Sequence, residues 1–290
     1  MKRTLIASAA LASLLAVTSA SAADLPVYTK APAVAVVYDW TGYYIGTNLG
    51  YSWGRGSTDG NVTGTQNVTT ARGATVLTSV NTVLATLPLT GRADVNGFIG
   101  GAQLGYNWQR EKWLFGLEGD IQFSNERGSG DVCTVAGCPP GSTVFTRDYK
   151  LDWFGTARGR VGFLPAERIL LYATGGLAYG NFSGSSWTLP QDIGTWSQVR
   201  AGWTVGAGAE AALGNNWSVK FEYLYMDLGH VGGSSANTTS ITSAVNTPSP
   251  GVTTTTTTNL AYVFNTRFTD SIVRVGLNYR FGAGPVVARY

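Results

Sequence analysis

The chain has 290 residues and a net charge of +3, and only 13% of its residues are charged, about half of the ~25% usual in soluble domains. A net charge this small argues against nucleic acid as a partner. One His and two Cys are too few for a metal cluster, so we expect no cofactor. Aromatic residues are plentiful, with 9 Trp and 14 Tyr.

The N-terminus has the pattern of a secretory signal peptide. Met1 to Arg3 is basic, Leu5 to Val17 is a short apolar stretch, and small residues follow up to Ala22. The apolar stretch is too short to span a membrane as a helix. We therefore predict a signal peptide over residues 1–22, with cleavage between Ala22 and Ala23.

An exported chain meets an oxidising compartment, and the two cysteines lie close together in "CTVAGC". This favours a disulfide between Cys133 and Cys138, although the spacing alone is also compatible with two free thiols. Residues 23–41 contain two prolines and read as an extended periplasmic lead-in.

From residue 42 onward, apolar and polar residues alternate in eight segments, which is the period of a β-strand with two unlike faces. No later stretch is apolar for about 18 residues, so no transmembrane helix is expected. The eight predicted strands cover residues 42–53, 96–109, 112–124, 150–165, 168–180, 199–212, 217–229 and 271–281.

The connections between these segments alternate in length. "QREK", "LPAE" and "LGNN" predict tight turns, whereas the four other connections, which are rich in Gly, Ser, Thr and Asn, cover residues 54–95, 125–147, 181–198 and 230–270. Loops this long are uncommon in compact soluble domains. Short turns at one end and long loops at the other are typical of transmembrane β-barrels.

Aromatic residues on the apolar faces gather near both ends of the predicted strands. Two such belts match the two membrane–water interfaces, where amphipathic rings collect. A soluble core gives no reason for this sorting, so we expect the apolar face to meet lipid. The predicted girdle comprises Tyr43, Trp53, Trp108, Trp113, Trp153, Phe163, Trp217, Tyr223, Tyr225, Tyr279 and Phe281.

The opposite faces combine many Gly residues with charges of both signs. Small residues leave room in the narrow interior of a small barrel, and buried charges are tolerated when they pair. We therefore expect interior ion pairs among Glu118, Asp120, Lys150, Asp152, Arg158, Arg160, Arg200, Glu210, Lys220, Glu222, Arg274 and Arg280.

Several stretches together resemble small outer-membrane β-barrel proteins of alphaproteobacteria, often labelled porin-family or opacity-like, some of which are described as haemin-binding. They are "DWTGYYIGTNLGYSWG", "GLEGDIQFS", "TARGRVGF", "LLYATGGLAYG", "FEYLYMDLG" and "RVGLNYRF". The resemblance covers nearly all of the mature chain. It implies an all-β fold in the bacterial outer membrane, an eight-stranded antiparallel transmembrane β-barrel of the OmpA type over residues 42–281, with four long extracellular loops and three short periplasmic turns.

One departure from such proteins concerns the C-terminus, where outer-membrane strands usually end on an aromatic residue read by the insertion machinery. Phe281 completes the last predicted strand, but residues 282–290 follow. We interpret them as a short periplasmic tail.

An eight-stranded barrel is filled by its own side chains, whereas open channels need about 16 strands. We therefore expect a structural role in envelope integrity and surface interaction, with no enzymatic activity. The expected partners are outer-membrane lipid and lipopolysaccharide, the barrel-insertion machinery and periplasmic chaperones; a surface ligand stays open.

Three alternatives remain. One is a porin-like channel for small solutes. Another is binding of haemin or another ligand by the extracellular loops, for which Tyr38, His230 and Tyr262 are conceivable ligands. The most remote is an outer-membrane hydrolase built on the single His, near Asp227, Ser234 and Ser235.

Overall fold

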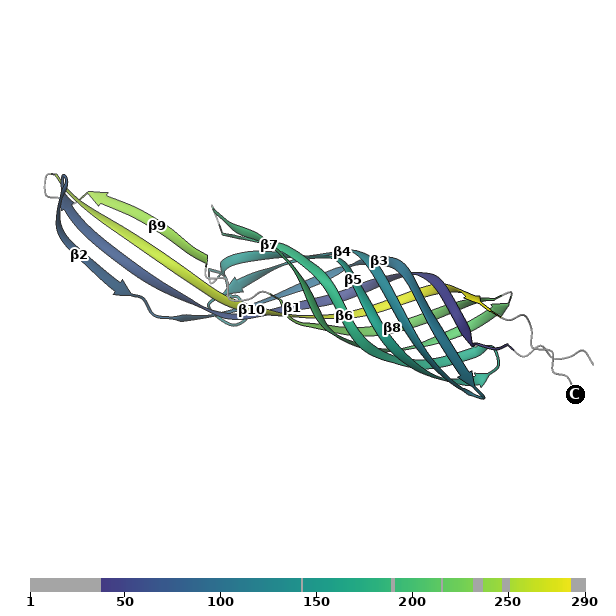
Figure 1. Ribbon diagram of the computed structural model, residues 1–290. Helices are drawn as coiled ribbons and strands as arrows, with labels where there is room; N and C mark the ends of the chain where they lie inside the picture. The colour runs from purple at the N-terminus through teal and green to yellow at the C-terminus, as the bar shows by residue number, and fades with distance from the viewer. Residues whose placement is uncertain are drawn as a thin grey trace, which may run out of the picture. The chain divides into compact units, whose positions relative to one another are not determined.

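The computed structural model (Figure 1) describes residues 38–141, 143–188, 191–214, 216–231, 237–246 and 251–282. The predicted signal peptide, its cleavage site at Ala22 and Ala23, the lead-in up to residue 37 and the tail after Gly282 lie outside the described residues. Within the described ranges there is no helix that is long and apolar enough to cross a membrane.

Ten antiparallel strands form one sheet in the order β2-β1-β3-β4-β5-β6-β7-β8-β10-β9, and β1 also pairs with β10. This pairing closes β1, β3 to β8 and β10 into an eight-stranded ring, which confirms the predicted fold class. The strands are β1 Gly42–Arg72, β2 Thr75–Val83, β3 Leu87–Arg110, β4 Trp113–Cys133, β5 Thr143–Ala166, β6 Ile169–Thr188, β7 Gln191–Gly214, β8 Trp217–Val231, β9 Asn237–Asn246 and β10 Val252–Phe281.

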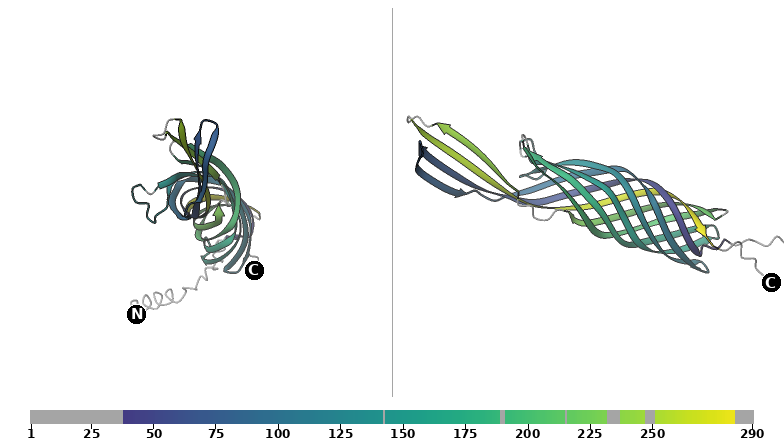
Figure 2. Two further views of the ribbon diagram at one scale, coloured as in Figure 1. Left: turned by 90° about the vertical axis from the view of Figure 1, so that its left-hand side faces the viewer. Right: turned by 45° about the horizontal axis from the view of Figure 1, so that its top comes forward.

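The long connections differ in conformation from the loops expected there, because most of their residues continue the strands. β1 and β10 stay paired from Tyr43 and Phe281 up to Arg72 and Val252, and β2 and β9 flank them beyond the ring (Figure 2). The run Thr253 to Thr258, expected to be an exposed loop, lies in β10. Threonine is β-branched and favours strands, so the polar composition of these segments did not prevent pairing.

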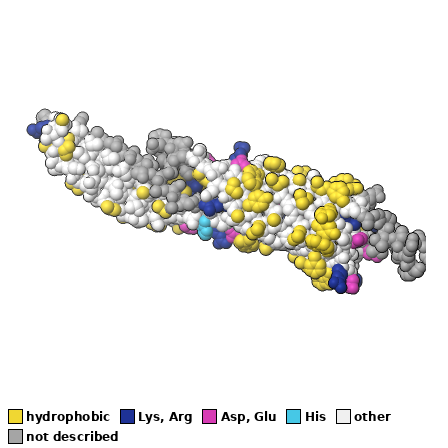
Figure 3. Space-filling model, in the orientation of Figure 1, with side chains coloured by type: hydrophobic (Ala, Val, Ile, Leu, Met, Phe, Trp, Pro, Cys, Tyr) yellow, Lys and Arg dark blue, Asp and Glu magenta, His cyan; other side chains and the backbone are white. Residues whose placement is uncertain are grey.

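The outer face of the ring is apolar over a defined height. About two-thirds to three-quarters of the residue surface is exposed at Leu49, Phe98, Leu104 and Leu177. Hydrophobic side chains cover this part of the surface, whereas the strand extensions, the parts of the strands that occupy the predicted long loops, are mainly neutral and polar (Figure 3). Such a surface is unfavourable in water and suits lipid.

Two belts of outward-facing aromatic residues bound this apolar zone. Ten residues separate Tyr43 from Trp53 on β1, or roughly 33 Å of strand and about 25 Å of height at a ~40° tilt. This matches the apolar band of outer-membrane barrels. Cross-strand register places Tyr43, Trp108, Trp113, Phe163, Trp217, Tyr279 and Phe281 near the short turns, and Trp53, Trp153, Tyr223 and Tyr225 toward the other end.

Candidate functional site

The lumen of the ring is crossed by one network of buried ion pairs. Glu118 lies within 4 Å of four cations, and Lys220 Nζ is 3.0 Å from its Oε1. Arg158 and Arg274 each place Nη2 2.9 Å from Asp120 Oδ2. The complete network joins four carboxylates to four cations: Glu118, Asp120, Glu210 and Glu222 with Arg158, Arg160, Lys220 and Arg274.

Two tyrosines of the barrel wall form hydrogen bonds with this network. The hydroxyl of Tyr44 donates to Glu118 Oε2 at 2.6 Å, and the hydroxyl of Tyr172 donates to Glu222 Oε1 at 2.9 Å. A Cβ added to Gly105 would come within 2.4 Å of the Tyr44 ring, and one added to Gly208 within 2.6 Å of the Tyr172 ring. Interior glycines thus make space for side chains that hydrogen-bond the buried charges.

Neutral polar groups add further hydrogen bonds to the charges. Asn278 Nδ2 donates to Glu210 Oε1 at 2.8 Å, and Arg160 Nε donates to Asn107 Oδ1 at 2.9 Å. Ser218 also donates to Glu210. Buried charges are tolerated when they are paired and hydrogen-bonded, and most polar atoms of this network meet that condition. Within the part of the chain that the structure describes, Asp120 Oδ1, Arg160 Nη2 and Arg274 Nη1 are buried without a hydrogen-bond partner.

Two further predicted interior cations lie apart from the network. Arg280 donates to the carbonyl oxygen of Thr41 at 3.1 Å and lies over the Tyr38 ring. Arg200 faces the lumen on β7 and is half-buried. Among the described residues, neither of them forms an ion pair.

The predicted interior position of Lys150 and Asp152 is corrected by the structure. They pair with each other on the outer face, where both side chains are partly exposed. The register shifts at Leu151/Trp153 between β5 and β6 and at Phe123/Glu126 between β4 and β5. Such a β-bulge reverses the inward and outward sets along a strand, so Leu151, predicted to face lipid, is fully buried in the lumen.

The end with the short turns is capped by the final residues of the lead-in. Trp40 is 1% exposed, and its Nε1 donates to the carbonyl oxygen of Glu167 at 3.1 Å while its amide donates to Gln109 Oε1 at 2.8 Å. It packs with Tyr38 in an apolar cluster that also includes Leu114, Leu164, Leu170, Tyr172 and Ala212. Sequence reasoning missed this cap, for which a Trp directly before the first strand was the available signal.

Beyond the ion pairs, toward the long connections, the lumen is filled mainly by apolar side chains, although the buried carboxyl residues Glu126 and Asp270 lie opposite Leu151 and Met226 in this region. Phe154, Leu224, Met226 and Phe268 are almost completely buried there, and they belong to a cluster with Ala93, Val95, Ile99, Tyr149, Leu151, Ala178, Phe182, Leu228 and Ile272. A second apolar cluster fills the strand extensions: Val62, Leu89, Val132, Phe145, Tyr262 and Phe264. The described interior is therefore filled at several heights.

Arg147 lies between these two apolar clusters, outside the membrane-spanning part. Its guanidinium lies 4.3 Å above the Phe264 ring centroid, and Nη1 donates to Thr266 Oγ1 at 3.0 Å. Burial lowers the pKa of Arg147 from its ordinary value, and the nearby Tyr149 works in the opposite direction. The aromatic faces supply a cation–π environment in place of a carboxylate.

The predicted haemin ligands do not come together. Tyr38 belongs to the cap near the short turns, whereas Tyr262 is buried in the strand extensions and His230 is exposed on β8. For the remote hydrolase alternative, Asp227 receives a hydrogen bond from Arg267 Nη2 at 2.5 Å, and Ser234 and Ser235 lie outside the described residues.

The two cysteines form the predicted disulfide, with their Cα atoms 5.4 Å apart. Cys133 ends β4, and Cys138 lies in the connection to β5. The bond therefore closes a short loop at the far end of a strand hairpin.

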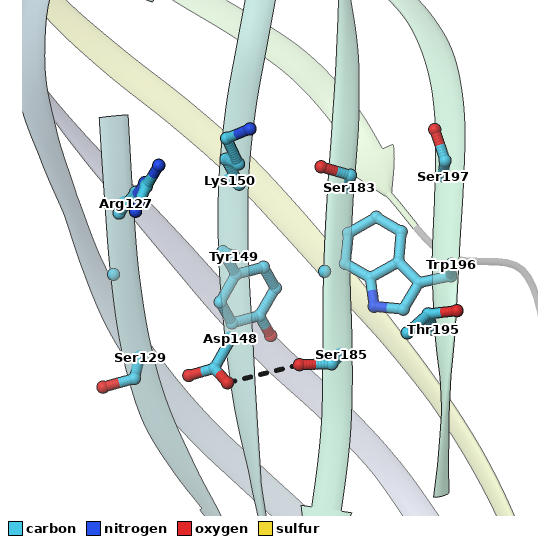
Figure 4. A pocket seen from close by; sticks show the side chains of 12 residues that line it. Arg127, Ser129, Asp148, Tyr149, Lys150, Ser183, Ser185, Thr195, Trp196 and Ser197 are labelled. Atoms are coloured by element: carbon cyan, nitrogen blue, oxygen red, sulfur yellow. Dashed lines mark hydrogen bonds between the residues drawn. The ribbon is translucent and has the colours of Figure 1, made fainter. Parts of the chain in front are cut away.

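A polar groove of about 930 Å³ lies on the outer wall across β4, β5, β6 and β7 (Figure 4). The register pairs Gly128 with Tyr149, Tyr149 with Gly184, and Gly184 with Trp196, so the backbone of this row forms the floor. Outward side chains from the two adjacent rows form the walls: Arg127, Lys150, Ser183 and Ser197 on one side, and Ser129, Asp148, Ser185 and Thr195 on the other.

Comparison with known proteins identifies the family. Residues 9–281 match the family model described as "Outer membrane protein beta-barrel domain". The chain belongs to this family. The 31 kDa outer-membrane immunogenic protein of Brucella melitensis is 37% identical over 289 residues, covering 97% of this chain and 100% of the relative. The 25 kDa outer-membrane immunogenic protein of Brucella abortus is 30% identical over 241 residues, covering 82% and 90%.

Among solved structures, Neisserial surface protein A is similar at 13% identity and a TM-score of 0.36, covering 83% of this chain and 98% of that one. The family match and the named relatives confirm the resemblance drawn from the sequence, and they place this outer-membrane β-barrel protein in the bacterial outer membrane.

Proposed function

We propose that this outer-membrane protein is a structural barrel with a lumen closed to solutes, which supports envelope integrity and presents an extended, non-enzymatic wall at the cell surface. The observation that carries the proposal is the ion-pair network joining β4, β5, β7, β8 and β10 across the lumen. Arg158, for example, contacts Glu118 and Asp120 from β4 and Glu222 from β8.

The layers on either side of the network support the same proposal. Trp40 fills the lumen near the short turns, and the apolar cluster around Phe154 and Phe268 fills it above the network. A solute path would have to displace a buried aromatic cap, break paired charges and cross an apolar layer. Each of these steps costs free energy that a wide channel does not require.

A liposome-swelling assay tests whether solutes pass. We expect proteoliposomes with the purified barrel to exclude small sugars and amino acids like protein-free liposomes, while an open porin in the same lipid admits them. Swelling that grows with barrel content and falls with solute size would favour the porin-like alternative.

The envelope role has a separate test in cells. We expect a strain lacking this protein to become more sensitive to detergent and to large antibiotics that an intact outer membrane excludes. A chain carrying His230→Ala should restore resistance fully, because the proposed role uses no catalysis. Failure of the deletion to change envelope permeability would contradict this role.

A further inference from the structure

The outer-wall groove is an unassigned site, and its residues come from four neighbouring strands. Arg127 lies directly opposite Lys150 in the β4–β5 register, and like charges placed opposite each other on a sheet repel. Asp152 contacts Lys150 and also accepts a hydrogen bond from Ser183 Oγ at 2.8 Å. Asp152 is thus the one carboxylate beside the two cations of this row, and the other carboxylate of the groove, Asp148, lies in the second row. The local excess of positive charge at Arg127 and Lys150 favours an added anionic group.

The second row of the groove has a different chemistry. Asp148 accepts a hydrogen bond from Ser185 Oγ at 3.2 Å, and Ser129 and Thr195 add hydroxyls beside it. Carboxylates and hydroxyls are suited to binding the hydroxyl groups of sugars. The groove therefore offers cations along one side and sugar-binding groups along the other.

The distance of the groove from the apolar zone of the barrel indicates which molecules can reach it. Arg127 follows Phe123 by four residues, and the outward-facing Phe123 lies opposite Trp153 of the aromatic belt toward the long connections. Four residues are roughly 13 Å of strand, which places Arg127 about 10 Å above the apolar zone. Asp148 and Lys150 are partly exposed and flank the buried Tyr149, so the side chains of the groove lie on the outer face of the strands rather than in the lumen. The molecules at this height around an outer-membrane barrel are the headgroups of the outer-leaflet lipid.

We propose that this groove binds the phosphorylated sugar headgroup of lipopolysaccharide, with the anionic group held by Arg127 and Lys150 and the sugar hydroxyls by Asp148 and the neighbouring hydroxyls. This site goes beyond the proposed closed barrel, and it does not depend on whether the lumen conducts.

The test titrates lipopolysaccharide with a short sugar core into the detergent-solubilised barrel and follows the rise in its thermal unfolding midpoint. We expect the double variant Arg127→Glu/Lys150→Glu to weaken the apparent affinity at least tenfold. The charge-conserving pair Arg127→Lys/Lys150→Arg should stay within about threefold of the wild type. Lys112→Glu, at a short turn on the other side of the membrane, serves as the matched control and should change nothing.

Two further ligands test whether binding needs the phosphate group and whether it needs the lipid part of lipopolysaccharide. Dephosphorylated lipopolysaccharide should bind the wild type as weakly as intact lipopolysaccharide binds the double variant. Soluble glucosamine phosphate should compete only at far higher concentration. The proposal is overturned if the double variant binds like the wild type, if Lys112→Glu loses as much affinity, if dephosphorylation has no effect, or if the soluble sugar binds as tightly as the lipid.

Discussion

The stability of each buried charge in this barrel depends mainly on the opposite charges that it contacts. Arg274 has no exposed side-chain surface and contacts Glu118, Asp120 and Glu222. Removing one member of a buried set leaves the others uncompensated, which is far more costly than losing a surface pair. The network therefore couples strands that lie far apart around the ring.

Replacing Arg274 with Met should lower the free energy of unfolding by about 3–5 kcal/mol, because the buried Glu222 and Asp120 lose a partner. Urea unfolding in detergent micelles measures the change. Arg55→Met is the matched control: Arg55 forms an exposed 3.4 Å pair with Asp94, and its loss should cost less than about 1 kcal/mol. Equal stability of the two variants would argue against the network.

At the residue scale, the sequence predicts much of the site. Its alternation identified all eight members of the network, since their strands below the bulges keep an unbroken period of two. It could not assign the partners, because these depend on strand stagger around the ring. It also could not assign Trp40, whose burial results from packing against residues on four separate strands, β4, β5, β6 and β7.

Among the structural elements, β5 shows how a bulge limits inference from a pattern. Arg158 and Arg160 face the lumen as expected, but the irregularity near Leu151 reverses the set above it. The alternation of residue types continues through the bulge without a visible break. Similarly, the far ends of β1 and β10, residues 65–72 and 252–259, are almost entirely polar and lack the apolar face that marks a strand from sequence, so the full length of these strands was not predictable.

Cysteine labelling tests the reversal in β5. In a Cys133→Ser/Cys138→Ser background, a membrane-impermeant maleimide added to whole cells should label Asp152→Cys rapidly, because this side chain faces outward. Leu151→Cys, on the adjacent residue, should stay protected in the lumen until the protein is unfolded. The opposite labelling pattern would contradict the reversal and support the predicted orientation, with Asp152 in the lumen and Leu151 facing outward.

For the whole molecule, the ring and its extensions have separable roles. The ion pairs, the Trp40 cap and both aromatic belts lie in the ring, whereas β2 and β9 pair only with β1 and β10. The extensions add an apolar interior of their own, but the charge network does not reach them. The fold of the ring should therefore tolerate shortening of the extensions.

Excision of part of one extension tests this independence. Val62 pairs with Leu87, so replacing residues 63–86 with Asn-Gly joins β1 to β3 by a short hairpin turn. We expect the shortened chain to fold and to keep the heat-dependent gel mobility of a closed barrel. A chain that no longer folds would show that the ring needs the extension.

The most direct test of the closed lumen is single-channel recording of the purified protein in a planar bilayer, with an open porin as the control for sensitivity. The ion-pair network between its apolar layers predicts a silent membrane, at most with brief and small current events. Large, stable steps whose current rises linearly with voltage would contradict the closed barrel.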